Sequence, residues 1–210
     1  MLRKGKTIVS KLYFRYGAMD SSKSANLIMV AYNYEKQGKR AVVLKPALDS
    51  RSDGGFVESR IGVRAPCLDI PPQGSILELL EPVRQAAPLD CILVDECQFL
   101  SAAQVEELVQ VVDQWDIPVI CYGLKNSYVK GELFEGSRAL LYYAESIEEI
   151  KTVCSFCNKK AIMNLRIVDG KPVYSGNKVQ VGDTARDSQE YYIPVCRKHY
   201  LAPPLGQKEE

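Results

Sequence analysis

Short apolar runs alternate with amphipathic segments over the first two thirds of the chain. Runs with the length and composition of β-strands lie at residues 12–16, 41–44, 91–94 and 118–122. Apolar positions three and four residues apart predict helices at residues 23–37, 76–84, from Ser101 onward, and at 137–144. The run at 91–94 lacks a polar position, which is typical of a strand buried on both faces. The alternation predicts an α/β fold, in which helices flank a parallel sheet.

Two regions depart from this alternation. Residues 54–90 contain many glycines and prolines, which predict loops around one short helix. Towards the C-terminus, residues 161–168 and 190–195 have the composition of strands, and Asp169-Gly170 is a signal for a hairpin turn. This second region therefore has the pattern of a small β-rich domain.

The change of pattern predicts the domain organisation. The expected parts are an α/β domain at 1–150, a small β-rich domain at 151–203 and a disordered tail at 204–210. A core as small as that of the second domain normally needs a bound metal or disulfides for stability.

The composition argues against some classes of partner and indicates a cellular compartment. The 210 residues include 27 Lys and Arg against 26 Asp and Glu, and 46% are apolar. A net charge of +1 provides no overall field for nucleic acid or an anionic membrane, so we expect neither as a partner. Apolar runs stay well short of the roughly 18 residues of a membrane helix, and we expect no signal peptide. Cysteines scattered mostly in apolar runs are typical of reduced thiols in the cytosol, the compartment we expect: Cys67, Cys91, Cys97 and Cys121.

Residues 17–24 nearly fit the phosphate-binding pattern G-x-x-x-x-G-K-[ST], between a predicted strand and a predicted helix. The segment consists of Gly17, Ala18, Met19, Asp20, Ser21, Ser22, Lys23 and Ser24. Backbone N–H groups of such a loop surround phosphate oxygens, while the lysine neutralises β/γ-phosphate charge and the final hydroxyl reaches Mg²⁺. Ser22 stands where the pattern has glycine, and Asp20 brings a negative charge close to the anion. The alternative is a polar loop in which Ser21 or Ser22 caps the helix.

An acidic pair follows the buried run at 91–94. In a parallel sheet, ligands bind at the carboxyl ends of strands, where Asp95 is expected to ligate the magnesium of a nucleotide. Glu96 is suited to act as a base on a hydroxyl or a water. The alternative is an acidic turn that precedes the helix at Ser101.

Cys154, Cys157, Cys196 and His199 form the pairs C-x₂-C and C-x₂-H. Three thiolates and one imidazole are a ligand set for tetrahedral Zn²⁺. With four protein ligands the metal has no open position, so we interpret the site as structural rather than catalytic. The alternative is two unrelated pairs of side chains.

Together these motifs resemble those of the zinc-containing, two-domain class of bacterial thymidine kinases. The resemblance extends from about Lys11 to Tyr200. Its segments are residues 12–19 with 23–24, 45–51, 59–62, 94–100, 121–125, 131–134, 149–154 and 195–200. It implies a RecA-like P-loop core with a zinc-anchored lasso loop. It also implies transfer of the γ-phosphate of ATP to the 5′-hydroxyl of thymidine, inhibition by thymidine triphosphate (dTTP) and a homotetramer.

The resemblance also implies roles for particular residues. Glu96 is implied as the base on the 5′-hydroxyl. Residues implied to bind ATP and Mg²⁺, beside those of the phosphate loop, are Asp49, Arg51, Asp95 and Gln98. Residues implied to contact the nucleoside are Phe99, Leu124, Phe134 and Tyr192. The chain differs from the family pattern at Ser22, in a longer segment at 125–133, and in a lasso at 182–190 that is longer and lacks Gly-Gly-Asn.

Two other functions remain open at this point. These differences are compatible with a divergent relative that has weak or altered deoxynucleoside kinase activity or a regulatory nucleotide-binding role. A zinc-ribbon module for nucleic acid fused to an ATPase is the second alternative, which the near-zero net charge disfavours.

Overall fold

The computed structural model describes residues 10–47, 55–176 and 189–205. Its helices are α1 (Lys23–Lys36), α2 (Ile76–Ala86), α3 (Ala102–Trp115), α4 (Glu135–Tyr143) and α5 (Arg197–Leu201), and η1 (Cys97–Phe99) is a 3₁₀ turn. The strands of the N-terminal part are β1 (Leu12–Tyr16), β2 (Ala41–Pro46), β3 (Phe56–Glu58), β4 (Arg64–Pro66), β5 (Leu68–Ile70), β6 (Cys91–Val94), β7 (Val119–Gly123) and β8 (Ser146–Glu149). Those of the C-terminal part are β9 (Thr152–Val153), β10 (Lys160–Ala161), β11 (Met163–Val168), β12 (Lys171–Val173) and β13 (Glu190–Val195).

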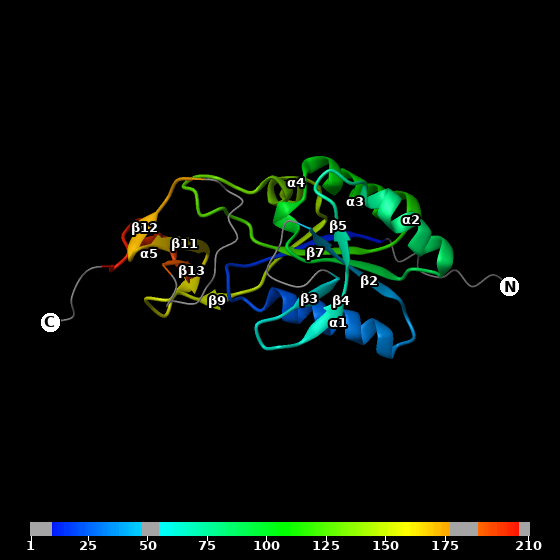
Figure 1. The fold of residues 1–210 in the computed structure, drawn as a ribbon, viewed down its shortest axis with the longest axis horizontal. Coiled ribbons are helices and arrows are strands. Elements are labelled where there is room, and N and C mark those ends of the chain that lie inside the picture. The colour runs from blue at the N-terminus through cyan, green and yellow to red at the C-terminus, as the bar shows by residue number, and fades with distance from the viewer. Residues whose placement is uncertain (1–9, 48–54, 177–188, 206–210) are drawn as a thin grey trace.

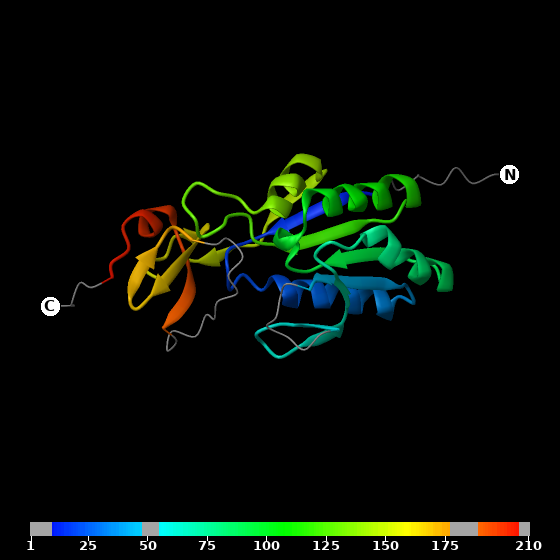
Figure 2. The same cartoon turned by 45° about the horizontal axis from the view of Figure 1, so that its top comes forward.

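The central sheet has the strand order β5-β2-β6-β7-β1-β8, and every neighbouring pair is parallel. Helix α1 lies on one face, while α2, α3 and α4 lie on the other (Figures 1 and 2). The expected α/β fold, a parallel sheet between helical layers, is confirmed. Parallel strands all end at the same edge of the sheet, so the loops after β1 and β6 lie at a common edge.

Residues of β6 show how the apolar run builds both faces. Ile92 and Val94 belong to the core under α2, α3 and α4. Cys91 and Leu93 belong to the core under α1. All four side chains are fully buried, which explains the absence of a polar position in this strand.

Several predicted elements agree closely with the structure. The strands at 12–16 and 91–94 are confirmed residue for residue. Ser101 caps α3 in a capping box with Gln104, because each side chain bonds the backbone N–H of the other residue.

The loops expected within residues 54–90 contain more structure than the sequence indicates. The segments β3 and β4 form an antiparallel hairpin, and β5 extends the central sheet beside β2. Each has three residues, too few for a periodic pattern to be recognised. The edge strand β8 was also not predicted, since its sequence, Ser-Ile-Glu-Glu, is mostly polar.

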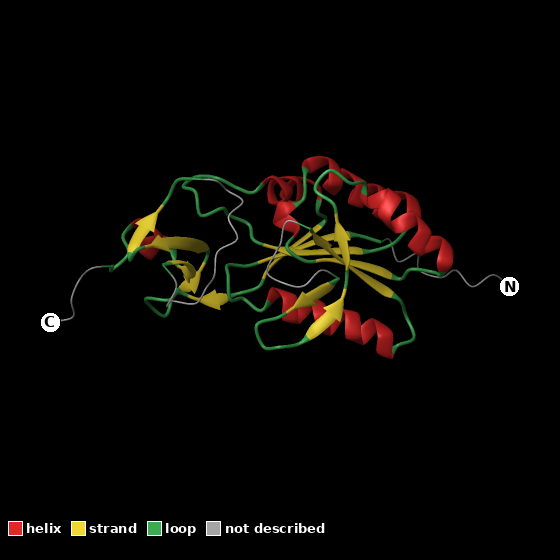
Figure 3. Ribbon diagram, in the orientation of Figure 1, coloured by secondary structure: helices red, strands yellow, loops and turns green. Residues whose placement is uncertain are grey.

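The C-terminal part is a β-rich region, as predicted (Figure 3). Strand β11 pairs with β12 and β13 in an antiparallel sheet, and β9 pairs with β10. The hairpin turn falls at Asp169 and Gly170, whose φ angles of 48° and 73° are those of a two-residue hairpin turn. Leu205 packs on the core of this region, whereas residues 206–210 of the expected tail lie outside the described residues. Within the described ranges, the structure has no helix long and apolar enough to cross a membrane.

Candidate active site

The phosphate loop connects the end of β1 to the start of α1. A Cβ atom on Gly17 would lie 2.3 Å from Ser21 Oγ and 2.5 Å from the Ile150 carbonyl oxygen, so this position requires glycine. Asp20 and Ser22 have φ angles of 61° and 59°, in the left-handed region. The glycine of the pattern is thus replaced by serine at a position whose backbone favours glycine, at a cost of about 1–2 kcal/mol.

Ser22 is also the N-cap of α1, but its side chain makes no capping hydrogen bond. The structure therefore does not support the alternative in which the Ser22 side chain caps the helix. The other candidate, Ser21, is buried with its hydroxyl accepting a hydrogen bond from Lys23.

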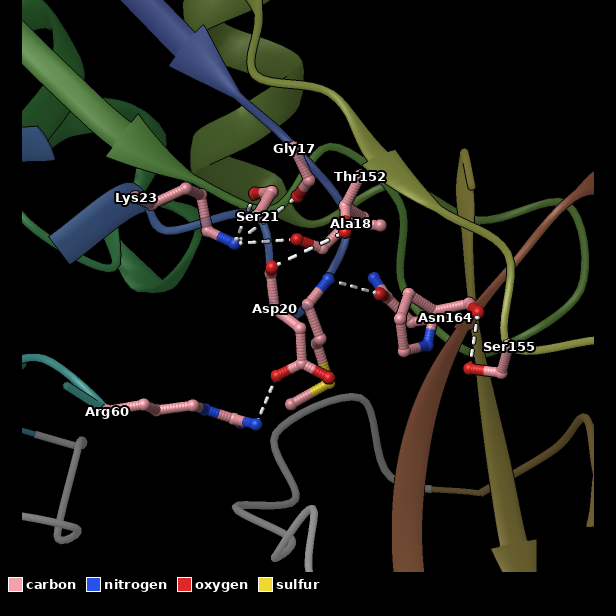
Figure 4. Close-up of polar contacts among 11 residues, drawn as sticks. Gly17, Ala18, Asp20, Ser21, Lys23, Arg60, Thr152, Ser155 and Asn164 are labelled. Carbon is pink, nitrogen blue, oxygen red and sulfur yellow. Dashed lines mark hydrogen bonds and ion pairs between the residues drawn. The ribbon is translucent and has the colours of Figure 1, made fainter. Parts of the chain in front are cut away.

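The ammonium group of Lys23 lies inside the curve of the loop (Figure 4). Its Nζ donates to the carbonyl oxygens of Gly17 and Ala18, at 3.4 and 2.9 Å, and to Ser21 Oγ at 3.4 Å. Lys23 is only 9% exposed, so water cannot fully solvate its charge. A phosphate oxygen is a stronger partner for a buried ammonium than a backbone carbonyl, which makes this loop a ready anion site.

The loop and the acidic end of β6 meet directly. Ser24 Oγ donates to Asp95 Oδ2 at 2.8 Å, although 71 positions separate the two residues. Asp95 is 3% exposed, and its Oδ1 is buried with no hydrogen-bond partner among the described residues. Burial, and then the charge of Glu96, raise the pKa of Asp95 to about 7. A hydroxyl and a buried carboxylate with an unused oxygen are ligands that fit a hard divalent cation such as Mg²⁺.

Glu96 is held next to Asp95 in a left-handed conformation, with φ 47°. Gln98, which is 2% exposed, donates from Nε2 to Glu96 Oε2. Its Oε1 accepts from the backbone N–H of Leu124 at 3.0 Å. Strained backbone in a non-glycine residue is common at functional sites, where surrounding contacts maintain it. The half-buried Glu96 carboxylate is thereby oriented, through the amide side chain of Gln98, from Leu124, the residue that follows β7.

Three of the four residues expected to contact the nucleoside lie near this carboxylate. Phe99 ends η1, and its ring meets Phe134 edge-on with a centroid separation of 5.7 Å. Leu124 is tied to Gln98 through its backbone N–H. Tyr192 lies instead on β13, 5% exposed, with its ring 5.8 Å from that of Tyr128.

Two predicted site residues, Asp49 and Arg51, lie outside the described residues. Residues 182–188 of the expected lasso also lie outside them.

The predicted metal ligands come together in the C-terminal region. The Sγ atoms of Cys154, Cys157 and Cys196 and a ring nitrogen of His199 all lie within 4.8 Å of one another. His199 Nδ1 is 3.3 Å from Cys154 Sγ and 3.6 Å from Cys196 Sγ, and the Cys157 and Cys196 sulfurs are 3.9 Å apart. Tetrahedral zinc places such ligand atoms about 3.5–3.8 Å apart. The cluster suggests a zinc site, and the alternative of two unrelated pairs is wrong.

Contacts to the phosphate loop from outside the central sheet were not predicted from the sequence. Asn164 on β11, 4% exposed, accepts a 2.8 Å hydrogen bond from the backbone N–H of Met19. Thr152 Oγ1 donates to the carbonyl oxygen of Asp20 at 3.4 Å, and Arg60 forms an ion pair with the Asp20 carboxylate (Figure 4). A signal existed for Asn164 alone, as a polar residue at a buried position of an otherwise largely apolar strand.

The parallel sheet, the loop around Lys23 and the contact between Ser24 and Asp95 define a P-loop nucleotide-binding protein with a metal-binding β-rich region. A family model described as thymidine kinase matches residues 10–200. The chain therefore belongs to the thymidine kinase family.

Curated relatives match over nearly their full length. The chain is 46% identical over 202 residues to a thymidine kinase of Enterococcus faecalis, covering 96% of this chain and 100% of that protein. It is 47% identical over 196 residues to a thymidine kinase of Lactiplantibacillus plantarum, covering 93% and 98%. It is 46% identical over 197 residues to one of Streptococcus agalactiae, covering 94% and 100%.

Proposed function

We propose that the chain is a thymidine kinase that transfers the γ-phosphate of ATP to the 5′-hydroxyl of thymidine, giving thymidine monophosphate (dTMP) and ADP. The contact between Ser24 and Asp95 carries this proposal, because it joins the phosphate loop to the acidic end of β6. Membership of the family gives the substrate class. The close match to relatives named thymidine kinase favours this activity over that of a divergent or regulatory relative.

In the proposed reaction, Lys23 exchanges its loop carbonyl partners for oxygens of the β- and γ-phosphates. Backbone N–H groups of the loop bind the remaining phosphate oxygens, apart from those of Gly17 and Met19, which donate to the Gly123 carbonyl oxygen and to Asn164 Oδ1. Ser24 and Asp95 would hold Mg²⁺, whose charge would neutralise the charge that develops on the transferring phosphate.

Glu96 acts as the base in this proposal. Its carboxylate accepts the proton of the 5′-hydroxyl while the hydroxyl oxygen forms a bond to the γ-phosphorus and the bond to the β,γ-bridging oxygen breaks. Gln98, expected from the resemblance to bind ATP and Mg²⁺, has its side chain committed to Glu96 and Leu124. We therefore assign it the orientation of the base.

The nucleoside pocket is proposed to include Phe99, Phe134 and Leu124, because the rings of Phe99 and Phe134 pack together and Leu124 bonds the side chain of Gln98, which holds Glu96. Tyr192 is proposed to contribute from the C-terminal region, where Tyr128 packs against it. Asp49 and Arg51 are proposed to assist with metal and phosphate.

The Cys₃His cluster is proposed to hold structural zinc, since all four coordination positions are filled by protein. We propose residues 1–150 as the kinase domain and 151–203 as the zinc-binding lasso domain. We also propose that the protein is inhibited by dTTP, forms a homotetramer and resides in the cytosol. None of the seven cysteines, all of which lie in the described residues, forms a disulfide, which is compatible with a reducing compartment.

The test is phosphate transfer from ATP labelled at the γ-position, with Mg²⁺ and each common deoxynucleoside in turn. We expect label in thymidine monophosphate, and loss of both transfer and ATP binding in Lys23→Met. Preferential labelling of another deoxynucleoside would contradict the specificity. No transfer to any deoxynucleoside by the intact chain would contradict the kinase assignment.

A further inference from the structure

The phosphate loop carries a negative charge of its own. Asp20 lies within the loop between Gly17 and Lys23, and its side chain is 38% exposed. Its carboxylate pairs with the guanidinium of Arg60, which reaches the loop from the hairpin of β3 and β4 (Figure 4). This ion pair joins two segments that are 40 positions apart in the sequence.

The Asp20 charge opposes the ligand that this loop is proposed to bind. A triphosphate carries several negative charges, and a carboxylate in the same loop repels it over a short distance. It also offsets the favourable charge of Lys23, whose ammonium lies in the same loop. A cation beside Asp20 removes this repulsion without altering the backbone of the loop.

Arg60 is well placed to be that cation, because its hairpin is firmly anchored. Val57 on β3 is 1% exposed and packs in the core under α1. The tip of the hairpin is closed by backbone hydrogen bonds from Ser59 N–H to the Val63 carbonyl oxygen and from Gly62 N–H to the Ser59 carbonyl oxygen, both 2.9 Å. The base of the Arg60 side chain is thereby fixed relative to α1 and the loop that precedes it.

The exposure of the pair points away from a role in folding. The side chains of Arg60 and Asp20 are 51% and 38% exposed, and ion pairs so accessible to water contribute little to stability. An effect on the electrostatic potential at the mouth of the loop does not require burial, since the triphosphate would bind within the same few residues.

We propose that Arg60 is a positioning residue for ATP, which neutralises Asp20 and so makes the phosphate loop attractive to the triphosphate. This inference rests on the proposed binding of ATP at the loop. It assigns a function to the β3–β4 hairpin, which contributes none of the residues expected in the site.

The hairpin offers a matched control. Arg64 on β4 is 45% exposed, pairs with Glu58 at 3.6 Å and lies over the ring of Phe56. It thus resembles Arg60 in exposure and in having a carboxylate partner, but that partner lies within the hairpin.

The experiment measures the dissociation constant of ATP with Mg²⁺ by titration calorimetry, and KM for both substrates. Arg60→Gln is expected to weaken ATP binding about fivefold, the order of magnitude for one uncompensated charge near a multivalent anion, and less at high salt. KM for thymidine is expected to stay within twofold of the wild-type value. Arg64→Gln is expected to bind ATP as the wild type does. Asp20→Asn added to Arg60→Gln is expected to restore ATP binding to within twofold of the wild type.

Three outcomes would overturn the proposal. Unchanged ATP binding in Arg60→Gln would show that Asp20 does not influence the ligand. Failure of Asp20→Asn to restore binding would show that Arg60 acts directly on the phosphates or on folding. An equal effect of Arg64→Gln would show a general effect of hairpin charge. Lys23→Met separates these from failure of the loop assignment itself, since ATP binding that survives that change would place ATP elsewhere.

Discussion

Replacement of Gln98 by methionine tests how Glu96, the proposed base, is oriented. Methionine is similar in length and volume to glutamine but has no hydrogen-bonding amide, so Gln98→Met removes two hydrogen bonds with little change in packing. One bond reaches the Glu96 carboxylate and the other comes from the backbone N–H of Leu124. Gln98 is 2% exposed, so water does not readily replace the lost amide as a hydrogen-bond partner.

The structure allows the size of the effect to be estimated. An unpaired buried N–H group, such as that of Leu124 would become, costs about 1–3 kcal/mol. The half-buried Glu96 carboxylate can bond water in place of the lost amide, so its lost hydrogen bond lowers the free energy of unfolding by a smaller amount. We expect the free energy of unfolding to fall by about 2 kcal/mol. We expect kcat to fall by about 10- to 100-fold, because an unrestrained carboxylate spends less time aligned with the hydroxyl.

Gln104 provides the matched control for this prediction. It is 5% exposed, its amide donates to the carbonyl oxygens of Pro71 and Gly74, and its Oε1 accepts from the N–H of Ser101. Gln104→Met should therefore lose comparable stability in urea unfolding while kcat is unchanged. Equal losses of kcat in the two variants, or full activity in Gln98→Met, would refute the orienting role.

Three further predictions concern the loop, the acidic site and the metal. Ser22→Gly should raise the free energy of unfolding by about 0.5–1 kcal/mol in urea titration. Glycine removes the strain of the left-handed backbone, and this gain exceeds the conformational entropy that glycine adds to the unfolded chain. A loss of stability would mean that Ser22 is not strained. In metal-free protein, Asp95→Asn should stabilise the fold above about pH 7 by about 1–3 kcal/mol. Burial raises the pKa of Asp95 from 3.8 to about 7, so the advantage of the variant should shrink as the pH falls and vanish near about pH 4; a pH-independent difference would exclude this titration. Cys157→Ser should lower the bound zinc measured by mass spectrometry. It should also raise KM for ATP, because loss of the metal loosens the region from which Asn164 bonds Met19 of the phosphate loop. Full zinc content would remove Cys157 from the ligand set.

The sequence predicts the elements whose pattern is strong. The apolar run at β6 and the capping box of α3 have signals that few other structures produce, and both occur as expected. The clustering of Cys154, Cys157, Cys196 and His199 was predicted because the spacing of cysteine and histidine residues reflects the geometry of metal coordination. The juxtaposition of Ser24 and Asp95 followed from the rule that parallel strands share a carboxyl edge.

Contacts between distant segments could not be predicted in the same way. The ion pair of Arg60 with Asp20 depends on where a three-residue hairpin strand lies, and that strand is too short to have a period. The hydrogen bond from Met19 to Asn164 joins the phosphate loop to the C-terminal region, a relation that no local pattern encodes. Tertiary packing, rather than local propensity, determines both contacts.

The central claim is that Glu96 accepts the proton of the nucleoside hydroxyl beside a phosphate loop that holds ATP. Single-turnover transfer of labelled γ-phosphate to thymidine by Glu96→Gln, at saturating ATP and thymidine, tests it most directly. The account predicts a rate reduced by about 10²- to 10⁴-fold with the ATP dissociation constant unchanged. Transfer at the wild-type rate would contradict it.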